Sequence, residues 1–248
     1  MPRVEVFADL DAVSRAGAAL FRDEATTSTG PVHIALSGGS TPRRMLELLA
    51  TPSYSDVIPW DRVNIWQVDE RPVPLDHPDS NAGMILAALT SRVPLAEGAV
   101  HFVPTDGRSP AEAAADYDAL LRRHFDTLPA FHLIFLGLGE DGHTASLFPY
   151  SLALAERERW ATANPVAKLG IERITLTYPV LNAARQVAFM VSGSEKAPAL
   201  EAVLYEPRDA ERWPAQGVEP AGGSPIWLVD AAARPATPSG AGMPPPPG

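Results

Sequence analysis

The feature that most restricts how this chain can fold is a regular alternation of short apolar runs with longer segments of helical periodicity. The apolar runs are predicted strands: VEVF (4–7), VHIAL (32–36), RVNIWQV (62–68), FHLIFLGL (131–138), RITLT (173–177), QVAFMVS (186–192) and PIWLV (225–229). Such alternation is typical of a mostly parallel sheet with helices on both faces. We therefore predict an α/β fold.

The segments between these runs are predicted helices. They include DLDAVSRAGAALFRDEA (9–25), TPRRMLELLA (41–50), NAGMILAAL (81–89) and SPAEAAADYDALLRRHF (109–125). The last begins with Ser109, Pro110 and Glu112, which is the pattern of a capped helix start. We expect Ser194 to cap a further helix, EKAPALEAVLY (195–205), and LALAERERW (152–160) to form a solvated helix face.

Composition limits the class of protein. The chain has 248 residues, 46% of them hydrophobic, and no cysteine, so we expect a sizeable core but no disulfide or thiolate chemistry. Its start, MPRVEVFADLDAV, lacks a signal-peptide pattern, and no apolar run is long enough to span a membrane. We therefore expect a cytoplasmic protein, present as a monomer or small homo-oligomer.

The formal net charge of −10 disfavours nucleic acid and anionic membranes as partners. An anionic substrate would require a local gathering of cations. Small polar motifs at the ends of predicted strands are the places to look for it, because ligands of parallel sheets bind at the carboxyl ends of the strands.

The first such motif is SGGSTP (37–42), which follows the strand VHIAL. Gly38 and Gly39 allow the backbone to turn and to approach a ligand closely. Ser40 and Thr41 add hydroxyls, and the helix that follows points its N-terminal amides toward the same place. The motif predicts a phosphate site, although an ordinary capped turn would have the same composition.

The second motif is DERPVPLDHPDSN (69–81), which follows the strand RVNIWQV. Asp69, Glu70 and Arg71 come at the carboxyl end of that strand, and a proline-rich loop leads on to Asn81. An arginine fork suits phosphate or carboxyl oxygens. The alternative interpretation is a solvated charged turn.

The third motif is GLGEDGHTASLFP (137–149), which ends the most apolar strand. Asp141 stands two residues before His143, and a carboxylate beside an imidazole can orient the ring and raise its basicity. We predict that His143 is catalytic. No further His or carboxylate stands at metal-ligand spacing, so we expect no metal.

Two cations belong to later predicted segments. Arg173 begins RITLT, and Lys196 lies in SGSEKA at the start of a helix, where a cation is unfavourable unless an anion is bound nearby. A surface lysine is the simpler alternative. His33 is expected to be a core or edge histidine.

Together these segments resemble the 6-phosphogluconolactonase family. The resemblance also includes RITLTYPVLNAA (173–184) and PAQGVEPAGGSPIWLVDAAA (214–233), and it spans nearly the whole chain in the family's order. It implies a single Rossmann-like domain, here residues 1–233, with no cofactor. The Pro/Gly-rich segment 234–248 is predicted to be a disordered tail.

The resemblance implies hydrolysis of 6-phospho-D-glucono-1,5-lactone to 6-phospho-D-gluconate, the second step of the oxidative pentose phosphate pathway. His143 would activate a water, oriented by Asp141, and Arg71 or the amides of 139–143 would stabilise the oxyanion. The substrate's phosphate would be held by Gly38, Gly39, Ser40, Thr41, Arg173 and Lys196. Asp69 would take part beside His143, and Asp69, Asn81 and Glu70 are the candidates for contacting sugar hydroxyls.

Two rival functions remain to be weighed. Glucosamine-6-phosphate deaminases resemble this chain in the phosphate loop and in a GxGxDGH segment, but there GH is usually followed by IAFNEP, which supplies a catalytic Glu. Here Thr144, Ala145 and Ser146 follow, and no Glu is present. A non-catalytic sugar-phosphate sensor would carry a DNA-binding module, for which the N-terminal segment has too few residues.

Overall fold

The computed structural model describes residues 3–166 and 170–235, so residues 236–248 of the predicted tail lie outside the described part. The helices are α1 (Leu10–Thr27), α2 (Ser40–Leu49), α3 (Pro52–Ser55), α4 (Asn81–Ile85), α5 (Pro110–His124), α6 (Tyr178–Ala183) and α7 (Ala197–Tyr205). The strands are β1 (Arg3–Phe7), β2 (Val32–Leu36), β3 (Val63–Gln67), β4 (Asp69–Glu70), β5 (Val100–His101), β6 (Leu133–Leu136), β7 (Ala161–Val166), β8 (Ile171–Leu176), β9 (Val187–Val191) and β10 (Ile226–Asp230).

The main sheet has seven strands in the order β1-β10-β9-β6-β2-β3-β5, and every neighbouring pair in it is parallel. Ile34 at the centre of β2 lies opposite Ile65 of β3 and Leu133 of β6. The predicted α/β fold is thereby confirmed. All four residues of β6, LIFL, are buried. A strand in the middle of such a sheet is covered on both faces, which is why its residues are apolar throughout.

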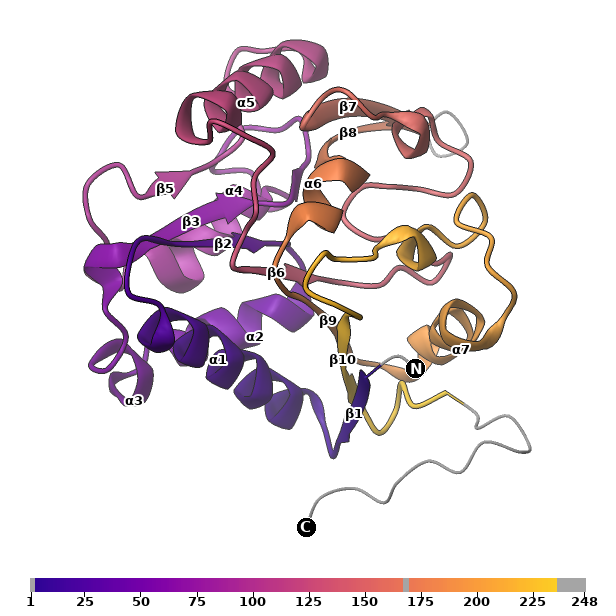
Figure 1. Ribbon diagram of the computed structural model, residues 1–248, viewed down its shortest axis with the longest axis horizontal. Coiled ribbons are helices and arrows are strands. Elements are labelled where there is room, and N and C mark those ends of the chain that lie inside the picture. Colours follow the sequence, from indigo (N-terminus) through magenta and orange to yellow (C-terminus); the bar gives the residue numbers. More distant parts are fainter. Residues whose placement is uncertain (1–2, 167–169, 236–248) are drawn as a thin grey trace.

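Two apolar clusters fill the space on either side of this sheet. One joins α1, α2 and α4 to the sheet through residues such as Phe21, Met45 and Ile85. The other joins α5, α6 and α7 to the opposite face through residues such as Tyr117, Leu181 and Leu200. Figure 1 shows α1 and α2 on one side of the strands and α5, α6 and α7 toward the other. In the described part of the chain, no helix is both long and apolar enough to cross a membrane.

A second, three-stranded antiparallel sheet has the order β4-β8-β7. RITLT was expected in the parallel series, but it lies in β8 of this small sheet, because β8 pairs with Asp69 and Glu70 of β4. The segment LALAERERW is likewise not a helix face: Leu152–Ala155 forms one 3-10 turn whose Ala153 and Leu154 are buried. Ser194 lies within a 3-10 turn instead of capping α7, whose N-cap is Lys196.

The strand order positions a site. Strands β9, β6, β2 and β3 are neighbours, and all run in the same direction. The segments that leave their carboxyl ends therefore meet at one edge of the sheet. Those segments contain all four motifs singled out in the sequence, at positions 37–42, 69–81, 137–149 and 192–197. Arg173 comes from β8 of the small sheet, and Asp69 and Glu70 form β4 of that sheet directly after β3.

Candidate active site

A cavity of about 280 Å³ opens where these segments meet. Of the predicted site residues, its lining contains Gly38, Gly39, Ser40, Thr41, Asp69, Arg71, Asn81, His143 and Lys196. Ser37, Ala145, Met190 and Ser192 also line it. The structure therefore brings together residues that are up to 159 positions apart in the chain.

The 37–42 segment turns sharply into α2. Gly39 has φ +110°, a value that only glycine adopts readily, and it is the N-cap of the helix. Ser40 and Thr41 lie in the first turn, where backbone N–H groups have no acceptor within the helix. A Cβ on Gly38 would lie only 1.8 Å from Asn81 Oδ1, so this backbone packs directly against the 69–81 segment. The turn is thus open to an anion on one side and closed on the other.

His143 and Asp141 form a close pair. Asp141 Oδ1 lies 2.6 Å from His143 Nδ1 and also accepts a hydrogen bond from the His143 amide at 3.1 Å. The imidazole stacks on Phe148 with ring centroids 4.3 Å apart. Burial works to raise the pKa of Asp141, but the hydrogen bond and charge of His143 outweigh it and hold that pKa below its usual value. Asp141 is therefore a carboxylate that fixes the ring.

The other ring nitrogen, Nε2, has no hydrogen-bond partner among the residues that the structure describes. The turn that carries the ring is closed by two hydrogen bonds, from Gly139 N to His143 O (2.8 Å) and from Gly142 N to Gly139 O (3.0 Å). Gly142 has φ +79° and Ala145 has φ +51°, which bends the chain so that His143 and Ala145 both line the cavity. The arrangement leaves one imidazole nitrogen free to exchange a proton.

Asp69, the first residue of β4, lines the same cavity. Its Oδ2 accepts a hydrogen bond from Ser146 Oγ at 2.7 Å. Burial raises the pKa of Asp69, opposed by the Ser146 hydrogen bond. Ser146 lies three residues after His143, so this hydrogen bond connects Asp69 to the segment that carries the imidazole.

Arg71 and Asn81 are connected. Arg71 Nη1 donates to Asn81 Oδ1 (2.9 Å) and to the Asp79 carbonyl (2.8 Å), while Asn81 Nδ2 donates to the Asp69 carbonyl (2.9 Å). Both ends of the Asn81 amide are thus occupied, so its geometry suits it to holding Arg71 in place.

Glu70 was expected to contact sugar hydroxyls, and its position differs. It is 1% exposed and does not line the cavity. Successive residues of a strand point to opposite faces, so Glu70 points inward where Asp69 points to the cavity. Its carboxylate accepts hydrogen bonds at 2.7–3.2 Å from Gln67 Nε2, Arg71 N, Ser80 Oγ, Asn81 N and Ala82 N. Glu70 therefore holds the ends of the 71–80 loop together and has no oxygen left for a sugar.

The two predicted cations are placed differently. Lys196 lines the cavity, and its Nζ lies 3.7 Å from Glu140 Oε1 on the histidine turn. Arg173 does not line it. Burial and the charge of Arg71 lower the pKa of Arg173, and its Nη1 donates to the Glu172 carbonyl at 2.8 Å. Arg173 is therefore near enough to Arg71 to feel its charge, but it is not part of the cavity wall.

Two polar residues at or beside the cavity were not among the site residues predicted from the sequence, namely Ser37 and Asp230. Ser37 is 4% exposed, lines the cavity, and its Oγ has no partner among the described residues. Asp230 lies behind the Lys196 segment, to which it is hydrogen-bonded through Gly193. Each stands directly at the end of a predicted strand, which was the only pattern that could have pointed to them.

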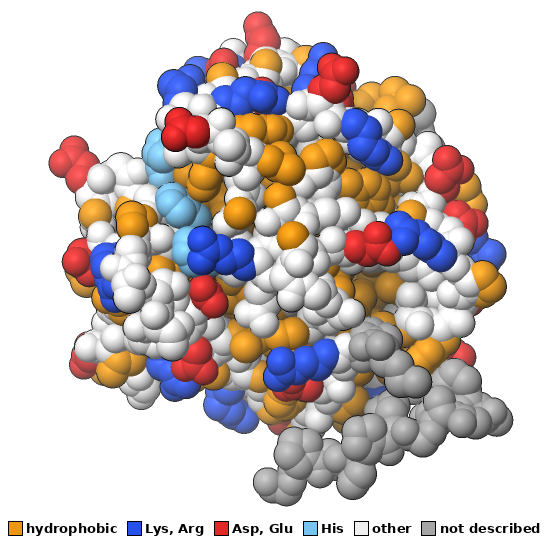
Figure 2. All heavy atoms as spheres, viewed as in Figure 1, with side chains coloured by type: hydrophobic (Ala, Val, Ile, Leu, Met, Phe, Trp, Pro, Cys, Tyr) orange, Lys and Arg blue, Asp and Glu red, His pale blue; other side chains and the backbone are white. Residues whose placement is uncertain are grey.

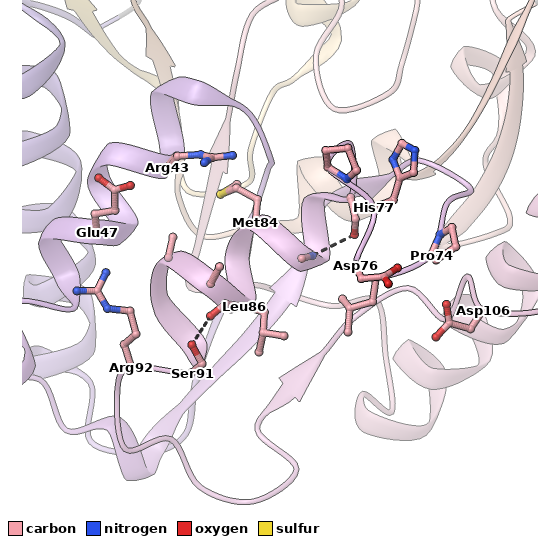
Figure 3. Close-up of a pocket in the computed structure, with 16 residues that line it drawn as sticks. Arg43, Glu47, Pro74, Asp76, His77, Met84, Leu86, Ser91, Arg92 and Asp106 are labelled. Atoms are coloured by element: carbon pink, nitrogen blue, oxygen red, sulfur yellow. Dashed lines mark hydrogen bonds between the residues drawn. The ribbon is translucent and has the colours of Figure 1, made fainter.

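A second, larger cavity of about 880 Å³ is lined in part by the proline-rich loop (Figure 3). Its walls carry Arg43 and Glu47 from α2, Arg92, and the loop residues Asp76 and His77. It contains no part of the His143 turn and no residue of 37–41. No group of three or more His, Asp or Glu side chains within residues 3–166 and 170–235 is arranged to hold a metal ion.

Comparisons with known proteins agree with this geometry. The family model described as glucosamine-6-phosphate isomerases/6-phosphogluconolactonase matches residues 8–227. The 6-phosphogluconolactonase of Nostoc sp. is 42% identical over 85% of this chain and 87% of its own length. The human 6-phosphogluconolactonase is 40% identical over 81% and 78%.

A solved structure, that of 6-phosphogluconolactonase from Thermotoga maritima, superposes with a TM-score of 0.78 at 27% identity and covers 92% of this chain and 99% of that one. The matched region contains all four segments that build the cavity. The chain therefore belongs to the glucosamine-6-phosphate isomerase/6-phosphogluconolactonase family.

Proposed function

We propose that this protein is an enzyme that hydrolyses 6-phospho-D-glucono-1,5-lactone to 6-phospho-D-gluconate, the second step of the oxidative pentose phosphate pathway. The relatives named 6-phosphogluconolactonase, at 40–42% identity over most of the chain, support this substrate. The observation that carries the proposal is one cavity with an unoccupied imidazole nitrogen on one wall and a glycine turn, a helix start and a lysine on another. The substrate is likewise two-ended, with an ester at C1 and a phosphate on C6.

The phosphate end would lie against the 38–41 turn. Its backbone amides, the Thr41 hydroxyl and the Lys196 ammonium are the groups at this end of the lining that attract an anion. In a chain of net charge −10 such a local gathering is needed for a phosphorylated substrate. Arg173, which does not line the cavity, would contribute by its charge and not by direct contact.

At the other end, His143 would act as the general base. Its Nε2 would take a proton from water as the water oxygen bonds to C1, while Asp141 stabilises the imidazolium that forms. The bond from C1 to the ring oxygen then breaks, and the imidazolium returns its proton to that oxygen. A δ-lactone hydrolyses readily by itself, so positioning and one general base, worth about 10²–10⁴-fold, supply much of what is needed. We propose no cofactor.

The tetrahedral intermediate carries a negative oxygen, for which two stabilising groups were considered. The amides of Gly139, Gly142 and His143 already donate hydrogen bonds within the turn. Arg71 lines the cavity and keeps donor atoms that its hydrogen bonds to Asp79 and Asn81 do not use. Arg71 is therefore the better candidate for the oxyanion.

The test is direct. Purified protein should release acid from freshly generated 6-phosphoglucono-lactone well above the spontaneous rate, and its product should be oxidised by 6-phosphogluconate dehydrogenase. Ammonia release from glucosamine 6-phosphate should stay at background. Ammonia release without lactone hydrolysis would replace the proposed reaction with deamination.

A further inference from the structure

A buried carboxylate outside the proposed chemistry, that of Asp230, is connected to the lysine of the cavity. Asp230 ends β10 and is 5% exposed. Its partners are a hydroxyl and backbone amides: Ser192 Oγ at 2.6 Å, Gly193 N at 3.2 Å to each oxygen, and Ala233 N at 2.7 Å. A buried carboxylate without such donors would be costly, so these contacts fix its place.

Three of these contacts go to the segment that leads into Lys196. Gly193, which is held by Asp230, accepts a hydrogen bond from the Lys196 amide at 3.0 Å. Gly193 has φ +105°, so the chain makes a bend there that other residues adopt only with strain. Asp230, Gly193 and Lys196 thus form a continuous chain of contacts from the sheet to the cavity.

Little else holds this turn. Within the 3-10 turn Ser194–Lys196 no residue is buried, and no side-chain cap stabilises its start or that of α7. Apolar packing resumes only at Ala199 and Leu200. Glu140 contacts the Lys196 ammonium at 3.7 Å, but the backbone of the turn that carries Lys196 depends mainly on the hydrogen bonds to Asp230.

We propose that Asp230 is a positioning residue, which holds the 192–196 turn so that Lys196 presents its ammonium to the substrate's phosphate. The inference rests on the proposed function for the identity of the anion. It predicts a loss of binding and little change in the chemical step, because His143 lies on a different segment.

The experiment compares Asp230→Asn, Lys196→Ala and the double variant, with KM and kcat for the lactone and the dissociation constant of inorganic phosphate as readouts. Lys196→Ala should raise KM about tenfold or more, as expected for loss of a charged contact. Asp230→Asn should raise KM and the phosphate dissociation constant about three- to tenfold, with kcat within about twofold of wild type. In the Lys196→Ala background, Asp230→Asn should change KM by less than about twofold, because both act through one contact.

Asp118→Asn is the matched control. Asp118 is a partly buried carboxylate that accepts hydrogen bonds from the backbone amides of Trp160 at 2.6 Å and Ala161 at 3.4 Å. It also pairs with Arg122 at 2.7 Å, and it does not line the cavity. It should lower the melting temperature and leave KM unchanged. Should Asp230→Asn fold poorly, Ser192→Ala removes only the hydroxyl contact and should give a smaller rise in KM of the same kind.

An unchanged KM in Asp230→Asn, or equal fold-changes in KM with and without Lys196, would overturn the inference. Absence of lactone hydrolysis by the wild type would overturn the proposed function instead. The phosphate titration would then still test Asp230, because it needs no turnover.

Discussion

Replacing Gly139 by alanine tests whether the orientation of His143 matters for turnover. A Cβ at position 139 would lie 2.0 Å from His143 Nδ1 and 2.7 Å from Asp141 Oδ1, whereas ordinary contact begins at 3.4 Å. The imidazole must therefore move by about 1.4 Å or lose its carboxylate partner. A misplacement of about 1 Å in an active site costs roughly 100-fold in rate, so we expect kcat to fall by about that factor.

Stability should change little in this variant, because the displaced atoms are the ends of partly exposed side chains, 31% exposed for His143 and 46% for Asp141. We expect a loss of less than about 1 kcal/mol. Initial rates corrected for spontaneous hydrolysis give kcat, and calorimetry gives the melting temperature. Gly30→Ala is the control, since a Cβ there meets nothing within 4 Å. Wild-type kcat in Gly139→Ala would refute the importance of this orientation.

Three further predictions concern binding, stability and pH. Lys196→Ala should raise KM about tenfold or more and Arg173→Ala by less than about threefold, because only Lys196 lines the cavity; steady-state kinetics of the two variants would contradict this if the order were reversed. Glu70→Gln should lower the free energy of unfolding, measured in urea, by about 2–3 kcal/mol, because an amide NH₂ group would replace a carboxylate oxygen that accepts hydrogen bonds from N–H groups. An unchanged midpoint of urea unfolding would contradict the anchoring role of Glu70. Burial lowers the pKa of His33 and of His101 to about 4, and both rings pack against Trp66. Figure 2 shows histidine side chains gathered at one edge of the face. In the unfolded chain both imidazoles bind a proton near pH 6.5, whereas in the folded protein they do so only near pH 4. Between these pH values the unfolded state holds more protons, so acidification favours unfolding. The free energy of unfolding should therefore fall between pH 6.5 and 4, by roughly 3 kcal/mol from His101 alone, and His101→Gln should reduce that slope; equal slopes would show the imidazole to be uninvolved.

The parts of the fold that follow from hydrophobic pattern could be predicted from the sequence. β6 and β9 are short, wholly apolar runs at the sheet's centre, where both faces must be buried, and the neighbouring β2 departs from this pattern only at His33. β7 has no such pattern: ATANPV contains Asn164 and Pro165, and it is a strand because it pairs with β8. The small antiparallel sheet was therefore not predicted, since it depends on pairing between distant segments.

The candidate site divides in the same way. The positions of Gly38, Lys196 and His143 follow from motifs at strand ends, because parallel strands bring their ends together. The direction in which a side chain points does not follow from a motif. Glu70 lies between two residues that line the cavity, yet it faces inward, and Asp230 becomes interesting only through its hydrogen bonds to a segment 37–38 positions away.

The most direct measurement is kcat for lactone hydrolysis by His143→Ala, with His77→Ala beside it. His77 also has a carboxylate two residues away in the chain, with Nδ1 3.9 Å from Asp79 Oδ2, but it lies outside the proposed active-site cavity. We predict that His143→Ala loses about 10²–10⁴-fold in kcat while its affinity for inorganic phosphate stays within about twofold, and that His77→Ala behaves as wild type. A His143→Ala protein that turns over the lactone at the wild-type rate would contradict the assignment of His143 as the general base.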